Sequence, residues 1–99
     1  MTKLDEYRIE IDEIDREIVQ LFEKRMETVL KVANYKKENE MEVLQSSREE
    51  VVLQKAVANL KDKKYEDDIR NVFELLMKLS RNSQKKELGL QRLILVDLR

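Results

Sequence analysis

Residues 4–39 read LDEYRIEIDEIDREIVQLFEKRMETVLKVANYKKEN and contain neither Gly nor Pro. Apolar side chains recur in this stretch at steps of three and four residues, and Glu and Lys fill the positions between them, which is the pattern of an amphipathic α-helix. The apolar face consists of Leu4, Ile11, Ile14, Ile18, Leu21, Phe22, Val29 and Val32. Such a helix is about 50 Å long, whereas a compact domain of this size has a radius of gyration of about 13 Å. The helix therefore needs a partner.

A second, shorter helix is expected over residues 47–60. We expect a break over residues 40–45 before it, although this segment has neither Gly nor Pro. Ser46 and Glu49 have the spacing of a capping box, in which the two side chains bind backbone N–H groups at the start of a helix.

A third helix is expected over residues 65–88, after a polar turn at 61–64. Its apolar residues recur at helical spacing, and Gly89 suits the position just past a helix C-terminus. The tail 89–99 is rich in apolar residues and receives no assignment. We therefore expect an all-α fold in which residues 1–99 form a single domain of three helices.

The composition excludes several kinds of chemistry. The chain has no Cys and no His, which rules out a thiol nucleophile, a Ser–His relay and the usual zinc sites. A single Gly and no Pro leave no glycine-rich phosphate loop. The 20 cationic and 21 anionic side chains nearly cancel, which argues against a nucleic-acid surface. We expect no metal and no cofactor, so any catalysis must come from Arg, Lys, Glu, Gln and Ser.

The sequence also lacks signals for a membrane or for secretion. No run of apolar residues approaches the eighteen or so that a membrane span requires, and the N-terminus has no apolar run like that of a secretory signal. The absence of Cys removes any argument from disulfides for an extracellular location. The expected location is the cytoplasm.

Cations interrupt the apolar face of the first helix. Arg8, Arg25 and Lys36 lie on or beside this face, where Asp15 is the anion available to them. A single long cationic side chain can extend its head to solvent, but three of them favour an anion supplied by a ligand. Arg25 and Lys36 are about 16 Å apart along the helix, whereas Arg8 lies about 25 Å before Arg25. In an antiparallel pair of such helices, Arg8 of one chain would approach Arg25 of the other.

The shorter helices carry polar groups beside their own apolar positions. Arg48 and Glu49 open the second helix, and Ser80 and Gln84 end an apolar row on the third. Taken singly, Glu49 fits a capping box, and Ser80 and Gln84 fit a solvated helix end. Together with the cations they describe a pocket suited to a small dianion that carries a hydroxyl group.

In their order and spacing these residues resemble the all-helical chorismate mutases of the AroQ class, over about residues 4–88. The matching pattern is Arg8, Asp15, Arg25, Lys36, Arg48-Glu49 and Ser80-x-x-x-Gln84. The resemblance implies an intertwined homodimer of three-helix chains whose long first helices pair antiparallel. The sequence departs from the family pattern at Gln45, where Asp is usual, and in its lack of Gly and Pro over residues 39–46.

The resemblance also implies an activity, the rearrangement of chorismate to prephenate in the biosynthesis of phenylalanine and tyrosine. This reaction requires no covalent catalyst. The enzyme holds the dianion in a chair-like conformation and stabilises negative charge on the ether oxygen. By resemblance, Arg25 and Arg8 of the partner subunit bind the two carboxylates, Ser80 assists a carboxylate and Arg48 helps to organise the site.

The other implied roles concern the ether oxygen and the hydroxyl group of the substrate. By resemblance, Lys36 and Gln84 donate hydrogen bonds to the ether oxygen as the carbon–oxygen bond breaks. Glu49 accepts a hydrogen bond from the hydroxyl, and Gln45 stands at a substrate-binding position.

Three other interpretations fit the same sequence. The first is a non-catalytic helical dimerisation module whose cations only reach out to solvent. The second is an isochorismate–pyruvate lyase, which shares the fold and eliminates pyruvate from a close relative of chorismate. The third is a mutase subunit that depends on, or regulates, another enzyme of the shikimate pathway.

Overall fold

The computed structural model describes the backbone of residues 1–97 and the side chains of residues 1–89. The chain folds into α1 (Lys3–Glu38), α2 (Ser46–Ala58), a short 3₁₀ helix η1 (Lys63–Tyr65) and α3 (Glu66–Asp97). The described residues include no β-strand. The all-α class, the three α-helices and the long first helix predicted from the sequence are therefore confirmed.

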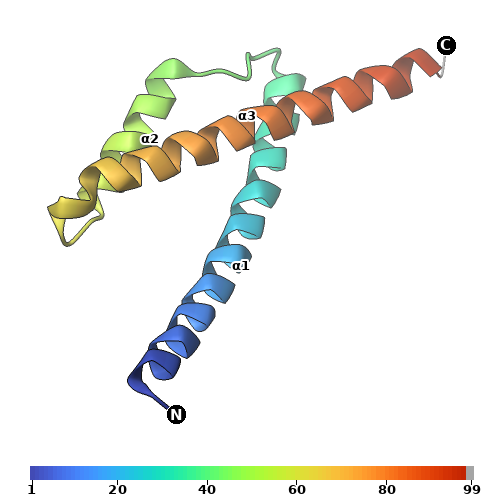
Figure 1. Cartoon of the computed structure of the whole chain (residues 1–99). Coiled ribbons are helices and arrows are strands. Elements are labelled where there is room, and N and C mark those ends of the chain that lie inside the picture. Colours follow the sequence, from blue (N-terminus) through green and yellow to red (C-terminus); the bar gives the residue numbers. More distant parts are fainter. Residues whose placement is uncertain (98–99) are drawn as a thin grey trace.

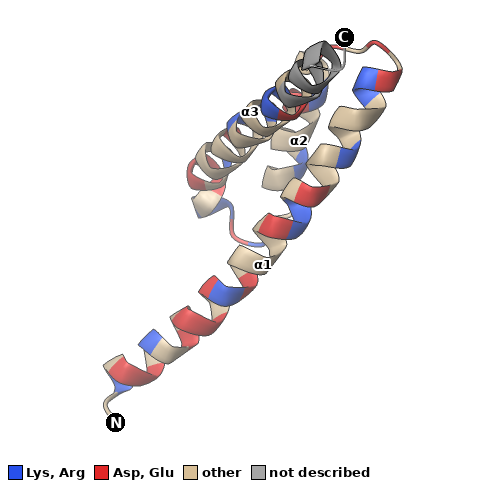
Figure 2. Cartoon of the chain, turned by 90° about the vertical axis from the view of Figure 1, so that its right-hand side faces the viewer, with Lys and Arg blue, Asp and Glu red and all other residues tan. Residues whose placement is uncertain are grey.

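The three helices form an open arrangement. Helix α3 packs against both α2 and the C-terminal half of α1 (Figure 1). The N-terminal half of α1 projects beyond the other two helices and carries many Asp and Glu residues (Figure 2). The radius of gyration is 18.0 Å, well above the value of about 13 Å for a compact domain of this length.

Helix α1 begins at a capping box that the sequence analysis missed. The backbone N–H of Asp5 donates to the Thr2 hydroxyl (3.2 Å), and the Asp5 carboxylate accepts from the Thr2 backbone N–H (3.1 Å). Asp5 and Glu6 in the first turn and Lys36 and Lys37 in the last turn also complement the helix dipole. Charges at both ends thus support a helix that is unusually long for a chain of this size.

Helix α1 ends in a Schellman motif within the segment where the sequence predicts a break. The N–H of Glu40 donates to the Lys37 carbonyl (3.3 Å), and the N–H of Met41 donates to the Lys36 carbonyl (2.7 Å). This turn requires a left-handed residue, which is usually Gly, and Glu40 occupies the position with a φ of 53°. The chain therefore turns sharply at a residue whose Cβ disfavours the left-handed conformation that the turn requires.

The capping signal at the start of the second helix did not produce the expected structure. Helix α2 begins at Ser46 itself, its N-cap is Gln45, and no side chain caps it. The capping box predicted for Ser46 and Glu49 is wrong, because the Glu49 carboxylate binds Arg81 of α3 instead.

The third helix does not end at residue 88. Helix α3 continues through Gly89 to Asp97, so most of the tail left without assignment continues the helix. Gly lowers helix stability by only about 1 kcal/mol relative to Ala, and here it lies inside the helix. Residues 98–99 of that tail lie outside the described residues.

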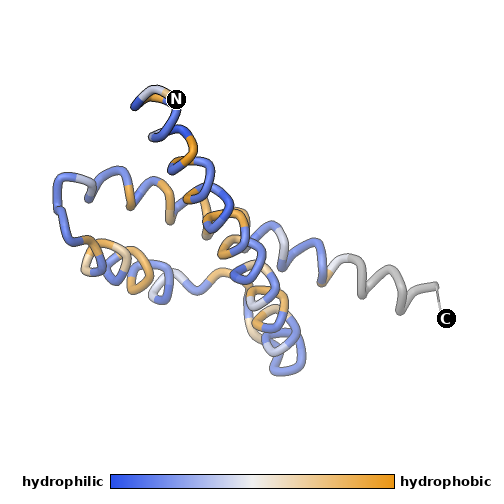
Figure 3. Tube along the Cα trace, turned by 90° about the horizontal axis from the view of Figure 1, so that it is seen from below, coloured by the Kyte–Doolittle hydropathy of each residue, from blue (hydrophilic) through white to orange (hydrophobic). Residues whose placement is uncertain are grey.

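A single chain buries little apolar surface. Among the side chains that the structure describes, the buried apolar residues are Ala33, Ala56 and Met77, and no large side chain is fully buried. Apolar positions recur along α1 beyond the region covered by α3 (Figure 3). The exposed face of α1 comprises Leu4, Tyr7, Ile11, Ile14, Ile18 and Leu21. A monomeric protein seldom leaves so long an apolar face uncovered.

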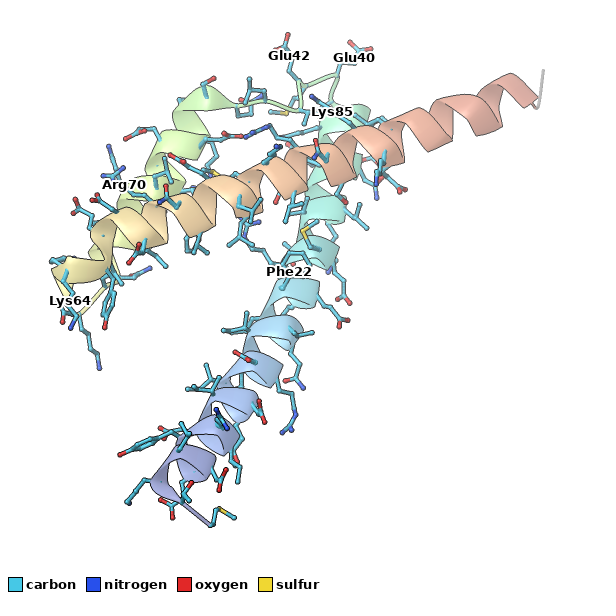
Figure 4. The ribbon with its side chains drawn as sticks, viewed as in Figure 1. Phe22, Glu40, Glu42, Lys64, Arg70 and Lys85 are labelled. Atoms are coloured by element: carbon cyan, nitrogen blue, oxygen red, sulfur yellow. The ribbon has the colours of Figure 1, made fainter. Side chains whose placement is uncertain are left out.

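We predict that Glu40→Gly stabilises the fold. Gly adopts the left-handed conformation without the Cβ clash, so the free energy of unfolding should rise by about 1 kcal/mol. Urea denaturation followed by circular dichroism, at one fixed protein concentration, measures the change. Glu42→Gly is the matched control, because both side chains point away from the helices (Figure 4) but only Glu40 has a positive φ. An equal gain in both variants would assign the effect to the lost charge.

Candidate active site

A recess of about 160 Å³ lies where the C-terminal half of α1, the α1–α2 connection, α2 and α3 meet. Seven of the eight site residues expected from the sequence line it: Arg25, Lys36, Gln45, Arg48, Glu49, Ser80 and Gln84. Apolar side chains, including Val29, Val52 and Met77, form the rest of its wall. An apolar cavity of about 150 Å³ can hold benzene, so this recess has room for one six-membered ring.

Arg8 is the expected site residue that does not line the recess. It is exposed on the projecting half of α1, seventeen residues before Arg25 and thus about 25 Å away along the helix. Within one chain, these two arginines do not share a site.

Arg25 and Ser80 connect α1 to α3 at one end of the recess. The guanidinium Nη1 of Arg25 donates to the Ser80 hydroxyl (2.7 Å), and this hydroxyl donates to the Leu76 carbonyl (2.7 Å). Burial lowers the pKa of Arg25 below its usual range, because desolvation penalises the charged form. Ser80 and Gln84 are 7% and 6% exposed, so they do not form a solvated helix end.

Lys36 occupies the opposite end of the recess. Its ammonium donates to the Val43 carbonyl in the α1–α2 connection (2.7 Å) and to the side-chain oxygen of Gln84 (3.3 Å). Burial lowers the pKa of Lys36 from 10.5, and the attraction of the Glu49 carboxylate opposes this shift. With its oxygen engaged by Lys36, Gln84 presents its amide nitrogen as the group that can donate to a ligand.

Glu49 has a partner that the sequence analysis missed. The guanidinium Nη1 of Arg81 lies 2.6 Å from both carboxylate oxygens of Glu49, which joins α2 to α3. Arg81 follows Met77 by four residues and precedes Gln84 by three, and all three line the recess. This helical spacing is the signal that could have placed Arg81 at the site.

Gln45 and Arg48 complete the polar lining. The side-chain amide of half-buried Gln45 donates to the Glu42 carbonyl (3.1 Å), which ties it to the α1–α2 connection. Arg48 lines the recess but remains exposed.

The chemistry of the recess is that of an anion-binding site. It is lined by four cationic side chains, those of Arg25, Lys36, Arg48 and Arg81, and among the described lining residues Glu49 is the one carboxylate. In the described part of the chain, no three Asp or Glu side chains gather where they could hold a metal ion. The arrangement can hold a small dianion and stabilise negative charge that develops within it.

Comparison with known proteins identifies the family. The family model for chorismate mutase type II matches residues 7–85, so the chain belongs to this family. A bifunctional chorismate mutase/prephenate dehydratase from Buchnera aphidicola subsp. Schizaphis graminum is 37% identical over 85 residues. That match covers 84% of this chain and 22% of the relative, so the chain spans about a fifth of the relative's length. No solved structure matches the chain at a significant level.

The part of the chain that the structure describes contains no helix with both the length and the apolar composition needed to cross a membrane.

We predict that the pKa of Lys36 lies below 10.5, because burial disfavours its charged form. Glu49→Gln removes the carboxylate that favours the charged form, so this substitution should lower the pKa of Lys36 further. An NMR titration of the lysine side chains measures both values, with Lys36→Arg identifying the resonance. A midpoint at or above 10.5, or one that Glu49→Gln leaves in place, would contradict the electrostatics described here.

Proposed function

We propose that this chain catalyses the rearrangement of chorismate to prephenate. The observation that carries the proposal is the pairing of Lys36 with Gln84 (3.3 Å), which places two hydrogen-bond donors side by side in a recess that also contains Arg25. Membership of the chorismate mutase type II family supports the same activity. We further propose that the enzyme works in the cytoplasm.

In this mechanism the protein holds the substrate and forms no covalent bond with it. Arg25 binds one carboxylate of the dianion. The partially buried hydrogen bond from Arg25 to the Ser80 hydroxyl holds the guanidinium in position. Arg48 adds positive charge from the exposed side of the recess. Holding the flexible molecule in its chair-like reactive conformation removes much of the entropic part of the barrier.

Lys36 and Gln84 act on the bond that breaks. Negative charge grows on the ether oxygen in the transition state, and the Lys36 ammonium and the Gln84 amide nitrogen donate to that oxygen. Both donors are held before the substrate arrives, since Lys36 is bound to Val43 and Gln84 at once. Donors that need no rearrangement stabilise developing charge most effectively.

We also propose that two chains form an antiparallel homodimer through α1. The exposed residues Leu4, Tyr7, Ile11, Ile14, Ile18 and Leu21 follow steps of three and four residues in strict alternation. This is the heptad pattern that pairs helices in coiled coils. A second copy of α1 would cover the apolar face that one chain leaves exposed.

The same pairing would bring Arg8 to the site. An antiparallel register that sets Arg8 opposite Arg25 of the partner also sets Leu4 opposite Val29 and Ile11 opposite Phe22. Apolar residues thus meet apolar residues in the register that brings the two arginines together. In this proposal Arg8 of the partner subunit binds the second carboxylate.

The proposed activity is tested by incubating the purified chain with chorismate, following the loss of its absorbance and identifying the product. Prephenate supports the proposal. With isochorismate as substrate, release of pyruvate would instead identify a lyase. A folded chain that neither binds nor converts either compound would be a dimerisation module. Activity that appears only on addition of another enzyme of the pathway would indicate a dependent subunit.

We predict that Gln84→Glu lowers kcat at neutral pH and regains activity as the pH falls. An ionised Glu places negative charge beside the ether oxygen, whereas a protonated Glu can donate to it. Lys36→Ala and Gln84→Ala should lower kcat by about a hundred- to a thousandfold, which is the usual cost of losing one such donor. Ser80→Ala should be milder, because Arg25 still holds the carboxylate.

Steady-state kinetics across pH, with circular dichroism to verify the fold, measures these effects. Near-normal kcat in folded Lys36→Ala would remove Lys36 from the proposed mechanism.

We predict that the active site is shared between two chains. Arg8→Ala and Arg25→Ala should each be almost inactive, but mixing them under conditions of subunit exchange should restore activity. A mixed dimer would contain one site with both arginines and one with neither. Sedimentation equilibrium should give twice the chain mass of 11.9 kDa. A fully active monomer, or no recovery after demonstrated exchange, would contradict the shared site.

A further inference from the structure

The Arg81–Glu49 ion pair is a second electrostatic feature of the recess, beyond the donors Lys36 and Gln84. A single guanidinium nitrogen, Arg81 Nη1, lies 2.6 Å from each oxygen of the Glu49 carboxylate. The two side chains are 28% and 26% exposed, so water screens this pair less than it screens a pair on the open surface. The contact fixes Glu49 of α2 against α3.

The Arg81–Glu49 pair lies between two recesses and lines both of them. Glu49 and Arg81 line the candidate active site, and both also line a larger recess of about 600 Å³ between α2 and α3. That larger recess is lined further along α3 by Asn71, Glu74 and Lys78, none of which lines the candidate active site. Arg81 therefore lies where the two recesses adjoin, and its ion-pair partner is Glu49 rather than Lys36 or Gln84.

Glu49 on its own would oppose the binding of a dianion. It is the one carboxylate among the described residues that line the recess, and it attracts the ammonium of Lys36. A free Glu49 would repel the substrate's carboxylates, and it would also compete with the substrate for Lys36. The charge of Arg81 offsets that of Glu49 and leaves Arg25, Lys36 and Arg48 to attract the dianion.

The pairing does not prevent Glu49 from binding a ligand. Each carboxylate oxygen has two lone pairs, so an oxygen that accepts from Arg81 can accept from a second donor as well. A carboxylate held by an ion pair is also ordered before the ligand arrives, which lowers the entropic cost of binding.

We propose that Arg81 is a positioning residue: it neutralises Glu49, keeps it away from Lys36 and holds it ready to accept a hydrogen bond from the hydroxyl group of the substrate. This inference rests on the proposed mutase activity and adds a determinant of specificity to it. Arg81 itself acts through Glu49 and makes no contact with the reacting atoms.

The test compares chorismate with an analogue in which hydrogen replaces the ring hydroxyl. Arg81→Met keeps an apolar stem and removes the charge, so kcat/KM for chorismate should fall about tenfold or more, mainly through KM, because the interaction contributes equally to ground and transition states. For the analogue, kcat/KM should fall by a clearly smaller factor, since the unpaired Glu49 would repel its carboxylates too but that ligand has no ring hydroxyl group from which Glu49 could accept. A purely structural role for Arg81 would lower both values equally.

Two further variants isolate the ion pair. In a Glu49→Gln background, Arg81→Met should change kcat/KM by less than about threefold, because coupled residues are not additive. Arg81→Lys retains the charge and should recover part of the lost activity. Lys78→Met is the matched control, since it removes one cation three residues away on the same helix, from a side chain that does not line the candidate active site. Lys78→Met should leave kcat/KM unchanged for both chorismate and the analogue.

The outcomes separate this inference from the proposed function. If the wild-type chain converts chorismate but Arg81→Met and Arg81→Lys leave the preference for the hydroxylated substrate unchanged, the inference is wrong and the function stands. If the folded wild-type chain does not convert chorismate, the proposed function is wrong and the inference falls with it.

Discussion

The Lys36 ammonium makes the contacts that join three parts of the site, because it connects α1 to the α1–α2 connection and to α3. It donates to the Val43 carbonyl before α2 and to Gln84 on α3, and its own backbone carbonyl accepts from Met41 in the turn that ends α1. Burial of this charge costs free energy, which the lowered pKa reflects, and the two acceptors offset part of that cost. The strained turn at Glu40 thus ends a helix and also brings an acceptor to Lys36.

The sequence predicts the fold where the signal is periodic and predicts it poorly where the signal is a single residue. Apolar spacing over residues 4–39 corresponds closely to α1, because many positions contribute to one period. Ser46 and Gly89 are compatible with a helix start and a helix end, but neither requires one. The predicted capping box does not form, and the Glu49 carboxylate binds Arg81 instead. Arg81 lies thirty-two residues further along the chain, so a local sequence pattern cannot reveal this contact.

The candidate site follows the same division. Arg25 and Lys36 could be identified in the sequence because cations on an apolar helix face need an explanation, and both line the recess. Ser80 and Gln84 had an equally good explanation as a helix end, and only packing against α1 shows that they are buried. Arg81 was missed because its meaning depends on Glu49, and the packing of α2 on α3 decides that contact.

The exposed face of α1 links the two proposals on function. Its apolar residues run from Leu4 to Leu21, and the same helix then contributes Arg25 and Lys36 to the recess. If two chains pair along that face, a dianion held between Arg25 and Arg8 of the partner subunit binds only the assembled pair. A ligand that binds one state of an equilibrium stabilises that state by mass action. Substrate would then favour the dimer, and the dimer would complete the substrate's site. Association and binding would therefore be two measurements of one coupling free energy, and a substitution such as Arg8→Ala would weaken that coupling while leaving the apolar face intact.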